Sequence, residues 1–270
     1  MENKIKNFWS FCAEREKIRS AKEKGQPRPW TNDSILHRHK FTNINRLHDR
    51  GTQLLIQLCK EYPAFDQFCA ISIYRFSGSN NGLIDMMHKY KPDQWFSQIA
   101  TVKPLFNMTA YQASWPAGQG KGVEFLKKII DQFCQLSYKK FTKNMSIIQA
   151  RDIMCDTLEY LNYKRMRFQT TEVAKDLSIL TDLVDPNSKC PMNVGAVKGL
   201  IYIFNSTSSH NVNLLINHES NPGYNTQIIE HALCEYSKYL DYQTGKRKYK
   251  NKVYKPTEIL YNNTTQEKTQ

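Results

Sequence analysis

The sequence predicts a mostly α-helical protein with few or no strands, and two observations support this prediction. Apolar residues recur at intervals of three and four along most of the 270-residue chain, which is the period of a helix that buries one face. The strict two-residue alternation of a half-buried strand is almost absent. Hydrophobic residues make up 40% of the chain and charged residues 23%, a balance typical of a folded domain and not of a disordered chain.

A first helix is expected over residues 5–19. Its apolar residues are spaced by three and four, and Gly25 follows where a helix commonly stops. The segment QPRPWTNDSIL comes next, and its two prolines restrict the backbone to an extended path. In that segment, Thr31 or Asp33 is expected to accept backbone N–H bonds at the start of the next helical turn.

Further helices are expected in the rest of the chain. A helix over residues 44–58 would carry Arg46, Asp49 and Arg50 on its polar side. The short apolar stretch CAISIYRF, residues 69–76, fits either a buried strand or a piece of helix, and we favour the helix. The remaining predicted elements are breaks at residues 77–82 and 115–122 and amphipathic helices at residues 123–136, 146–161, 170–183, 195–204 and 225–240.

The charge balance points to a polyanionic partner, because the chain has 38 Lys and Arg residues but only 25 Asp and Glu residues and therefore a net charge of +13.

We expect one helical domain over residues 1–245, with room for two lobes and a cleft between them, and a basic tail over residues 246–270. Cations and tyrosines alternate in the tail, so it has groups that neutralise phosphates and rings that stack on bases. A solvated tail that only aids solubility is the alternative. The tail cations are Lys246, Arg247, Lys248, Lys250, Lys252 and Lys255.

Several function classes lack their sequence signals. No apolar run approaches the roughly 18 residues of a membrane span, and the first residues lack the features of a signal peptide, so we expect a cytoplasmic protein. The seven cysteines are scattered without a C-x-x-C pair and the seven histidines show no ligand spacing, so we expect free thiols, no metal site and no cofactor. The sequence GQGKG, residues 118–122, does not have the spacing of a phosphate-binding P-loop, so a nucleotide kinase activity has no carrier here.

The segment CPMNVGAVKGL, residues 190–200, resembles the hairpin of helix-hairpin-helix DNA-binding proteins and DNA glycosylases. Asn193 and Gly195 stand at the turn positions of that pattern, and Gly199 stands at its small-residue position. Asn and Gly tolerate positive φ, and the start of the next helix would offer backbone N–H groups to a DNA phosphate, with Lys198 adding a cation. An ordinary turn between two helices is the alternative.

A glycosylase would also need a carboxylate to stabilise the oxocarbenium-like sugar as the base departs. Glycosylases with this hairpin place an Asp about twenty residues beyond it, but residues 195–217 contain no Asp or Glu, and Glu219 is the nearest candidate. Asp176 in TTEVAKDL and Glu235 in IEHALCEYSKY are the other two candidates. For both, a structural ion pair is the alternative interpretation.

Several segments together resemble the helical domain of the 5-hydroxymethyluridine DNA kinases of bacterial viruses and of the related α-glutamyl/putrescinyl thymine pyrophosphorylases. Rare residues occur in context in FWSFCAEREKIR, GQPRPWTNDSIL and KFTNINRLHDRGTQLL, which together lie within residues 8–55. The later segments FNMTAYQ, TTEVAKDL, NVGAVKGL and IEHALCEYSKY follow in the same order. The resemblance therefore runs from about Phe8 to Tyr254.

This resemblance implies a helical, glycosylase-like fold that acts on modified pyrimidines in DNA. In the viral kinases the domain is joined to a P-loop domain, and without that domain we expect the helical domain's own chemistry. By the family pattern, arginines would clamp phosphate, Trp30 would stack on an extruded base, and carboxylates would serve as acid or base. Besides Asp176 and Glu235, the residues that would line or support the site are Glu14, Arg15, Trp30, Thr31, Asp33, Arg46, Asp49, Arg50 and Lys238.

The sequence thus leads us to expect a DNA glycosylase that binds double-stranded DNA, flips out a hypermodified pyrimidine and hydrolyses its N-glycosidic bond. Such an enzyme would suit defence against viruses with modified DNA, and it needs no obligatory protein partner. The first alternative is a transferase that displaces pyrophosphate from an activated 5-hydroxymethyl group with an amino acid or a polyamine. The second is a DNA-binding module without catalysis, which would require Asp176 and Glu235 to face solvent or to be locked in ion pairs.

Overall fold

The computed structural model describes residues 1–60, 62–106 and 122–246, and the regular secondary structure of these residues is helical, without a β-strand. The predicted mostly α class is confirmed. No helix in this part of the chain combines the length and the apolar character needed to cross a membrane. The chain divides into two compact units, which we describe separately.

Unit 1 consists of Met1–Ile44, Val194–Pro222 and the chain from His231 onward. The predicted first helix is confirmed and extends further than expected, because one of its faces is buried from Ile5 to Ala21. Phe8 and Phe11 lie against the ring of Tyr236, with ring centroids 5.4 and 5.3 Å apart. The helices of unit 1 are α1 (Glu2–Glu23), α2 (Ser34–Arg38), α11 (Val194–Phe204), α12 (Ser209–Ile216) and, from His231 onward, α13 (Thr226–Gln243).

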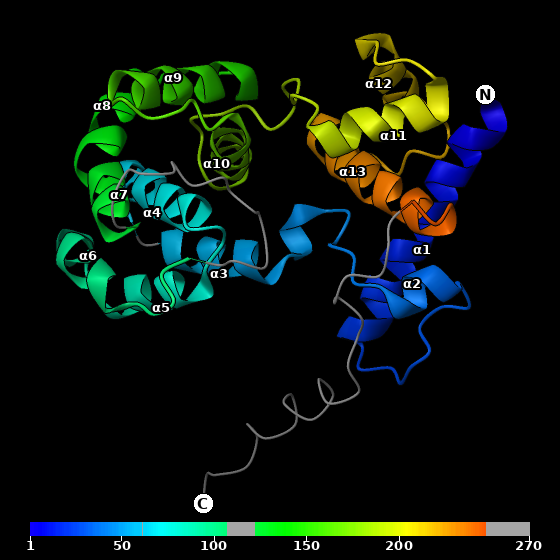
Figure 1. The fold of residues 1–270 in the computed structure, drawn as a ribbon, viewed down its shortest axis with the longest axis horizontal. Helices are drawn as coiled ribbons and strands as arrows, with labels where there is room; N and C mark the ends of the chain where they lie inside the picture. Colours follow the sequence, from blue (N-terminus) through cyan, green and yellow to red (C-terminus); the bar gives the residue numbers. More distant parts are fainter. Residues whose placement is uncertain (61, 107–121, 247–270) are drawn as a thin grey trace, which may run out of the picture. The chain divides into compact units, whose positions relative to one another are not determined.

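Unit 2 consists of Asn45–Asn193 and Gly223–Glu230, and its largest apolar core is formed around α4 and α10. Helix α10 packs against both α9 and α4 (Figure 1). Phe76 of α4 meets the ring of Phe133 at 5.2 Å. The helices are α3 (Arg50–Cys59), α4 (Ala64–Phe76), α5 (Asn81–Lys89), α6 (Pro92–Gln98), α7 (Gly122–Lys128), α8 (Cys134–Tyr138), α9 (Ile147–Tyr160) and α10 (Arg167–Leu180), with the short turns η1 (Arg46–His48), η2 (Ile99–Thr101) and η3 (Ile129–Phe133).

The helix predicted over residues 44–58 is wrong at its start. The side chain of Asn45 accepts a hydrogen bond from the backbone N–H of Leu47 at 2.9 Å and closes the separate turn η1. Asp49 then has an extended backbone, with φ −77° and ψ 130°, so α3 begins only at Arg50. Arg46, Asp49 and Arg50 therefore do not share one helix face.

The favoured helix at residues 69–76 is confirmed as part of α4, and the break at residues 77–82 is confirmed as far as Asn80, after which α5 begins. The helix predicted over residues 123–136 is one helical run interrupted by the π turn η3. The later predicted helices are confirmed within a few residues as α9, α10, α11 and α13, whereas α5, α6 and α12 were not predicted. The break predicted at residues 115–121 and most of FNMTAYQ lie outside the described residues.

A close approach between α11 and α13 depends on Gly199. A Cβ atom at this position would lie 2.5 Å from the backbone carbonyl oxygen of Leu233, closer than non-bonded atoms approach. The small residue that the hairpin pattern places at Gly199 is therefore required for the packing of unit 1.

We predict that Gly199→Ala lowers the free energy of unfolding by about 1–3 kcal/mol, because the added methyl group forces the two helix backbones apart. Urea denaturation followed by circular dichroism measures this loss. Val194→Ala on the same helix is the matched control, since Val194 is 89% exposed. An unchanged Gly199→Ala protein would contradict the close approach.

Candidate functional site

A cluster of charged side chains is buried around α10 in unit 2. Each has at most 8% of its surface exposed, which is rare for charged residues unless they are paired. Three are cations and three are anions, so the cluster is balanced in formal charge. Its members are Arg46, Arg75, Glu172, Lys175, Asp176 and Glu230, and we call them the buried charge network.

Asp176 lies at one end of this network, between two arginines. The Arg75 guanidinium contacts both oxygens of the carboxylate, with Nη2 3.0 Å from Oδ1. Arg46 Nη1 lies 3.3 Å from the same oxygen. No part of Asp176 is exposed. Asp176 is therefore held in a buried ion pair, as the alternative interpretation of its sequence predicts.

The other end of the network reaches the residue that precedes α11. Lys175 Nζ lies 3.0 Å from Glu172 Oε1 and also contacts Glu230, while Arg46 contacts Glu172. Glu230 in turn accepts a hydrogen bond from the backbone N–H of Asn193 at 3.4 Å. The conformation just before α11 is thus tied to the same set of buried charges.

The hairpin predicted at residues 190–200 differs from its pattern. Helix α10 ends at Leu180 and α11 begins at Val194, so residues 181–193 replace the short turn. Neither Asn193 nor Gly195 has a positive φ, so the expected use of their conformational freedom is wrong. Asn193 immediately precedes α11, and its backbone N–H donates a hydrogen bond to the Glu230 carboxylate.

In unit 1, three predicted site residues hold the backbone of residues 40–42. Arg15, only 4% exposed, donates from Nη2 to the carbonyl oxygens of Phe41 and Thr42 at 3.2 and 3.1 Å. Lys238 donates to the carbonyl oxygen of Lys40 at 2.6 Å. Glu235 accepts from the backbone N–H of Thr42 at 2.9 Å. These side chains therefore fix a segment of the chain, and Arg15 does not present its charge to solvent.

Asp33 forms the predicted cap of α2. One oxygen of its carboxylate accepts from the backbone N–H groups of Ile35 and Leu36, both at 2.9 Å. The other accepts from the hydroxyl of Tyr239 at 2.7 Å. Burial and the hydrogen bond to Asp33 raise the pKa of the Tyr239 hydroxyl, so it stays protonated and remains a donor. Thr31 supports the turn, because its hydroxyl accepts from the Asp33 N–H at 3.0 Å.

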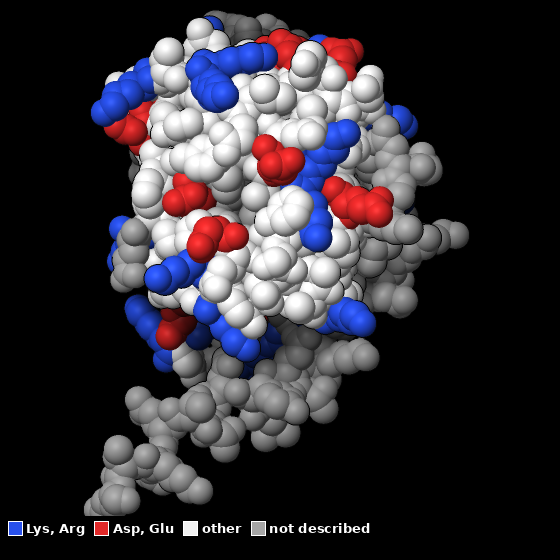
Figure 2. All heavy atoms as spheres, turned by 90° about the vertical axis from the view of Figure 1, so that its left-hand side faces the viewer, with Lys and Arg blue, Asp and Glu red and all other residues white. Residues whose placement is uncertain are grey.

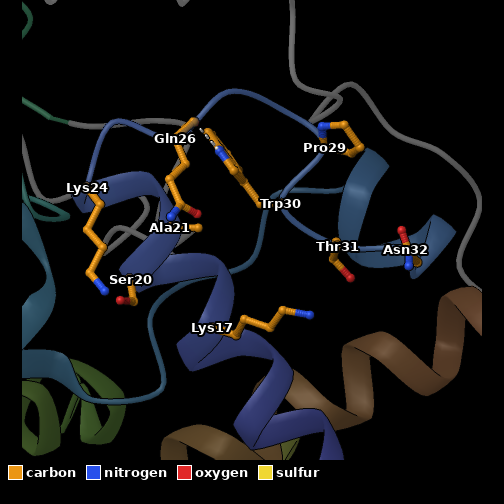
Figure 3. Close-up of a pocket in the computed structure, with 9 residues that line it drawn as sticks. All are labelled: Lys17, Ser20, Ala21, Lys24, Gln26, Pro29, Trp30, Thr31 and Asn32. Atoms are coloured by element: carbon orange, nitrogen blue, oxygen red, sulfur yellow. Dashed lines mark hydrogen bonds between the residues drawn. The ribbon is translucent and has the colours of Figure 1, made fainter.

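Trp30 lines a pocket of about 400 Å³ in unit 1, between α1 and the loop that follows it (Figure 3). Lys17 and Ser20 come from α1, Lys24 directly follows its last residue, and Trp30 and Asn32 come from the loop. None of the described residues that line the pocket is acidic. The sequence predicted Trp30 and Thr31 here but not the α1 residues, whose spacing along one helix face was the available signal.

The remaining predicted residues are dispersed. Lys198 pairs with Asp241 at 2.6 Å, and Lys246 lies over the ring of Tyr202 at 5.4 Å. Arg247 and Lys248 lie outside the described residues. Glu219 is exposed in a turn after α12, and Arg50 is exposed at the start of α3. Half-buried Glu14 forms a 3.5 Å pair with Lys17, and half-buried Asp49 precedes α3.

One face of the protein carries positive and negative side chains in a mixed arrangement. Figure 2 shows the face at the left of Figure 1, where Lys and Arg side chains alternate with Asp and Glu side chains across wide uncharged areas. This face therefore lacks the excess of cations that attracts a phosphate backbone.

Sequence reasoning missed Arg75, Glu172, Lys175 and Glu230 as members of one network. A signal existed for Arg75, since it is a cation within the apolar stretch CAISIYRF. Cys59 and Cys190 are poor nucleophiles, because burial raises the pKa of their thiols to about 12. Among the described residues, no three His, Cys, Asp or Glu side chains are grouped so that they would hold a metal ion.

Comparison with known proteins gives one family. The family model described as "5-hmdU DNA kinase, helical domain" matches residues 2–248. No curated protein and no solved structure matches the chain.

We predict that Asp176→Asn lowers the free energy of unfolding by roughly 3–5 kcal/mol, because it leaves buried Arg75 without its carboxylate partner and removes one of the two carboxylates that contact Arg46. Chemical denaturation measures the loss. Glu219→Gln, which changes an exposed carboxylate in the same way, should leave stability unchanged. Equal free energies of unfolding for the two variants would contradict a stabilising role of the ion pairs made by Asp176.

A second prediction concerns pH and His39, which is 3% exposed and stacks on Tyr242 with ring centroids 3.9 Å apart. Burial, followed by the charges of Lys238 and Arg38, lowers its pKa below 6.5. The unfolded chain therefore binds the proton more tightly, and stability should fall as pH drops below about 6.5. His39→Phe keeps the stack without the titration, so urea midpoints between pH 7 and pH 5 should fall less for this variant. Parallel curves would contradict the assignment.

Proposed function

The chain belongs to the family of helical domains of 5-hmdU DNA kinases, and from this membership we propose that it binds DNA containing 5-hydroxymethyluracil or a base derived from it. The family match over residues 2–248 carries the proposal. The net charge of +13 supports it, because neutralising phosphates supplies most of the sequence-independent affinity of DNA-binding proteins.

The state of the candidate carboxylates supports binding over catalysis. Asp176 is fully buried between two arginines, and Glu235 is engaged by a backbone N–H and by Lys238 at 3.3 Å. A carboxylate that stabilises a departing sugar must reach it, and these two are already neutralised by their own partners. A DNA-binding module without catalysis is expected to have Asp176 and Glu235 in ion pairs, and both carboxylates are ion-paired.

Catalysis at the modified base is the second candidate, with hydrolysis of the N-glycosidic bond first and transfer of an amino acid or polyamine to an activated 5-hydroxymethyl group second. The buried charge network favours it. Burying six charges costs desolvation energy that apolar packing would avoid, and charges kept at that cost are often found at functional sites. Opening of the network on DNA binding would be needed to free Asp176.

We predict that the full chain binds a duplex with a single 5-hydroxymethyluracil at least several-fold more tightly than the same duplex with thymine. Fluorescence anisotropy measures both affinities, and both should weaken as salt rises because counterions are released. Equal affinity for the two duplexes at every salt concentration would contradict the proposed recognition.

The two candidates separate in one further assay. The chain is incubated with the modified duplex, and the small molecules released are identified by mass spectrometry. We expect intact DNA. Free 5-hydroxymethyluracil would instead demonstrate a glycosylase. Pyrophosphate release from DNA with a pyrophosphorylated hydroxymethyl group, dependent on an added amine, would demonstrate a transferase.

A further inference from the structure

The pocket beside Trp30 has the features of a site for an anion attached to a planar ring. The chain reverses direction at the end of α1, where Gly25 has φ +65°. The backbone N–H groups of Gly25 and Gln26 bond to the carbonyl oxygens of Lys22 and Ala21 at 3.1 and 3.0 Å. These bonds engage helix-end carbonyls that would otherwise repel an anion.

Positive charge is concentrated around the pocket. Lys24 directly follows α1, and its backbone N–H still bonds to the carbonyl oxygen of Ser20, so it lies on the same face as Lys17 and about 10 Å further along the helix axis. Arg28 lies over the Trp30 ring, with its guanidinium carbon 4.6 Å from the ring centroid. Lys17 also forms a 3.5 Å surface pair with Glu14, and such exposed pairs exchange readily for a stronger anion.

The ring of Trp30 is held in place at the pocket wall. Its Nε1 donates to the carbonyl oxygen of Gln26 at 2.7 Å, and Figure 3 shows this bond fixing the indole across from α1. Indole faces stack on nucleobases, and a fixed ring loses little freedom when it does so. The amides of Gln26 and Asn32 and the hydroxyl of Ser20 supply donors and acceptors for the edge of a base.

From this geometry we propose that the pocket binds a single pyrimidine nucleotide, with the phosphate at Lys17 and Lys24 and the base against Trp30. The volume of about 400 Å³ lies in the range of small-ligand sites and is too small for a base pair with its backbones. The occupant is therefore one nucleotide unit, either extruded from DNA or free. The inference rests on the proposed function, because that function supplies the pyrimidine.

The test uses 5-hydroxymethyl-2′-deoxyuridine 5′-monophosphate and the full chain in isothermal titration calorimetry. Trp30→Leu and the double variant Lys17→Gln/Lys24→Gln should each weaken binding at least tenfold. The double variant Lys139→Gln/Lys140→Gln, which removes two exposed charges from unit 2, should bind like the unchanged chain. Trp30→Phe should restore part of the affinity. Circular dichroism melting shows whether each variant is folded.

Two simpler probes test the ligand class. Thymidine, which lacks the phosphate, and inorganic phosphate, which lacks the base, should each bind more weakly than the nucleotide. Phosphate that binds as tightly as the nucleotide would overturn the proposal in favour of a simple anion site. Unchanged nucleotide binding by Trp30→Leu, or equal losses in both lysine double variants, would overturn it as well.

The same variants distinguish this inference from the proposed function. If Trp30→Leu loses nucleotide binding and also the preference for modified over thymine-containing duplex, the pocket receives the extruded base. If nucleotide binding depends on Trp30 but the unchanged chain does not distinguish the two duplexes, the proposed function fails and the pocket stands as a site for free nucleotide. If the duplex preference persists in Trp30→Leu while nucleotide binding is absent from the unchanged chain, the pocket inference fails alone.

Discussion

The buried charge network is the constraint on which unit 2 depends. Asp176 links η1 to α4 by pairing with Arg46 and Arg75, and Glu230 links α10 to the backbone just before α11. Three cations balance three anions, so removal of any one member leaves an uncompensated charge inside the protein. These ion pairs add directional contacts to the apolar packing of the elements that they join.

Unit 1 uses charge differently, because its Arg15, Glu235 and Lys238 side chains all bind backbone groups, in addition to the pair between Glu235 and Lys238. Arg15 and Lys238 saturate the carbonyl oxygens of residues 40–42, and Glu235 takes the N–H of Thr42. A segment without helix or strand has no internal partners for these groups, so side chains must supply them. The family segments that contain these residues therefore have a structural reason for their composition that does not involve a substrate.

The sequence predicts most of the fold because helical period is a local property. It misses α5, α6 and α12, which are short and whose pattern gives only two turns to judge. It also misplaces the start of α3, since the turn closed by Asn45 competes with helix over the same residues. The site is harder to predict. Arg15 and Arg46 have the same formal charge as a phosphate clamp, and only tertiary structure shows that carbonyl oxygens and carboxylates already occupy them.

The distribution of charge separates the groups that hold the fold from those that meet a partner. Residues 247–270 contain six Lys and Arg and two Asp and Glu, so they account for four of the thirteen excess charges and the rest of the chain for nine. The buried charge network adds nothing to these nine, because its own charges cancel. Exposed cations such as Lys17 and Lys24 therefore carry the excess. On the proposed function, a partner with a phosphate would meet exposed cations of this kind and not Arg15 or Arg46, because carbonyl oxygens and carboxylates inside the protein already bind those two arginines.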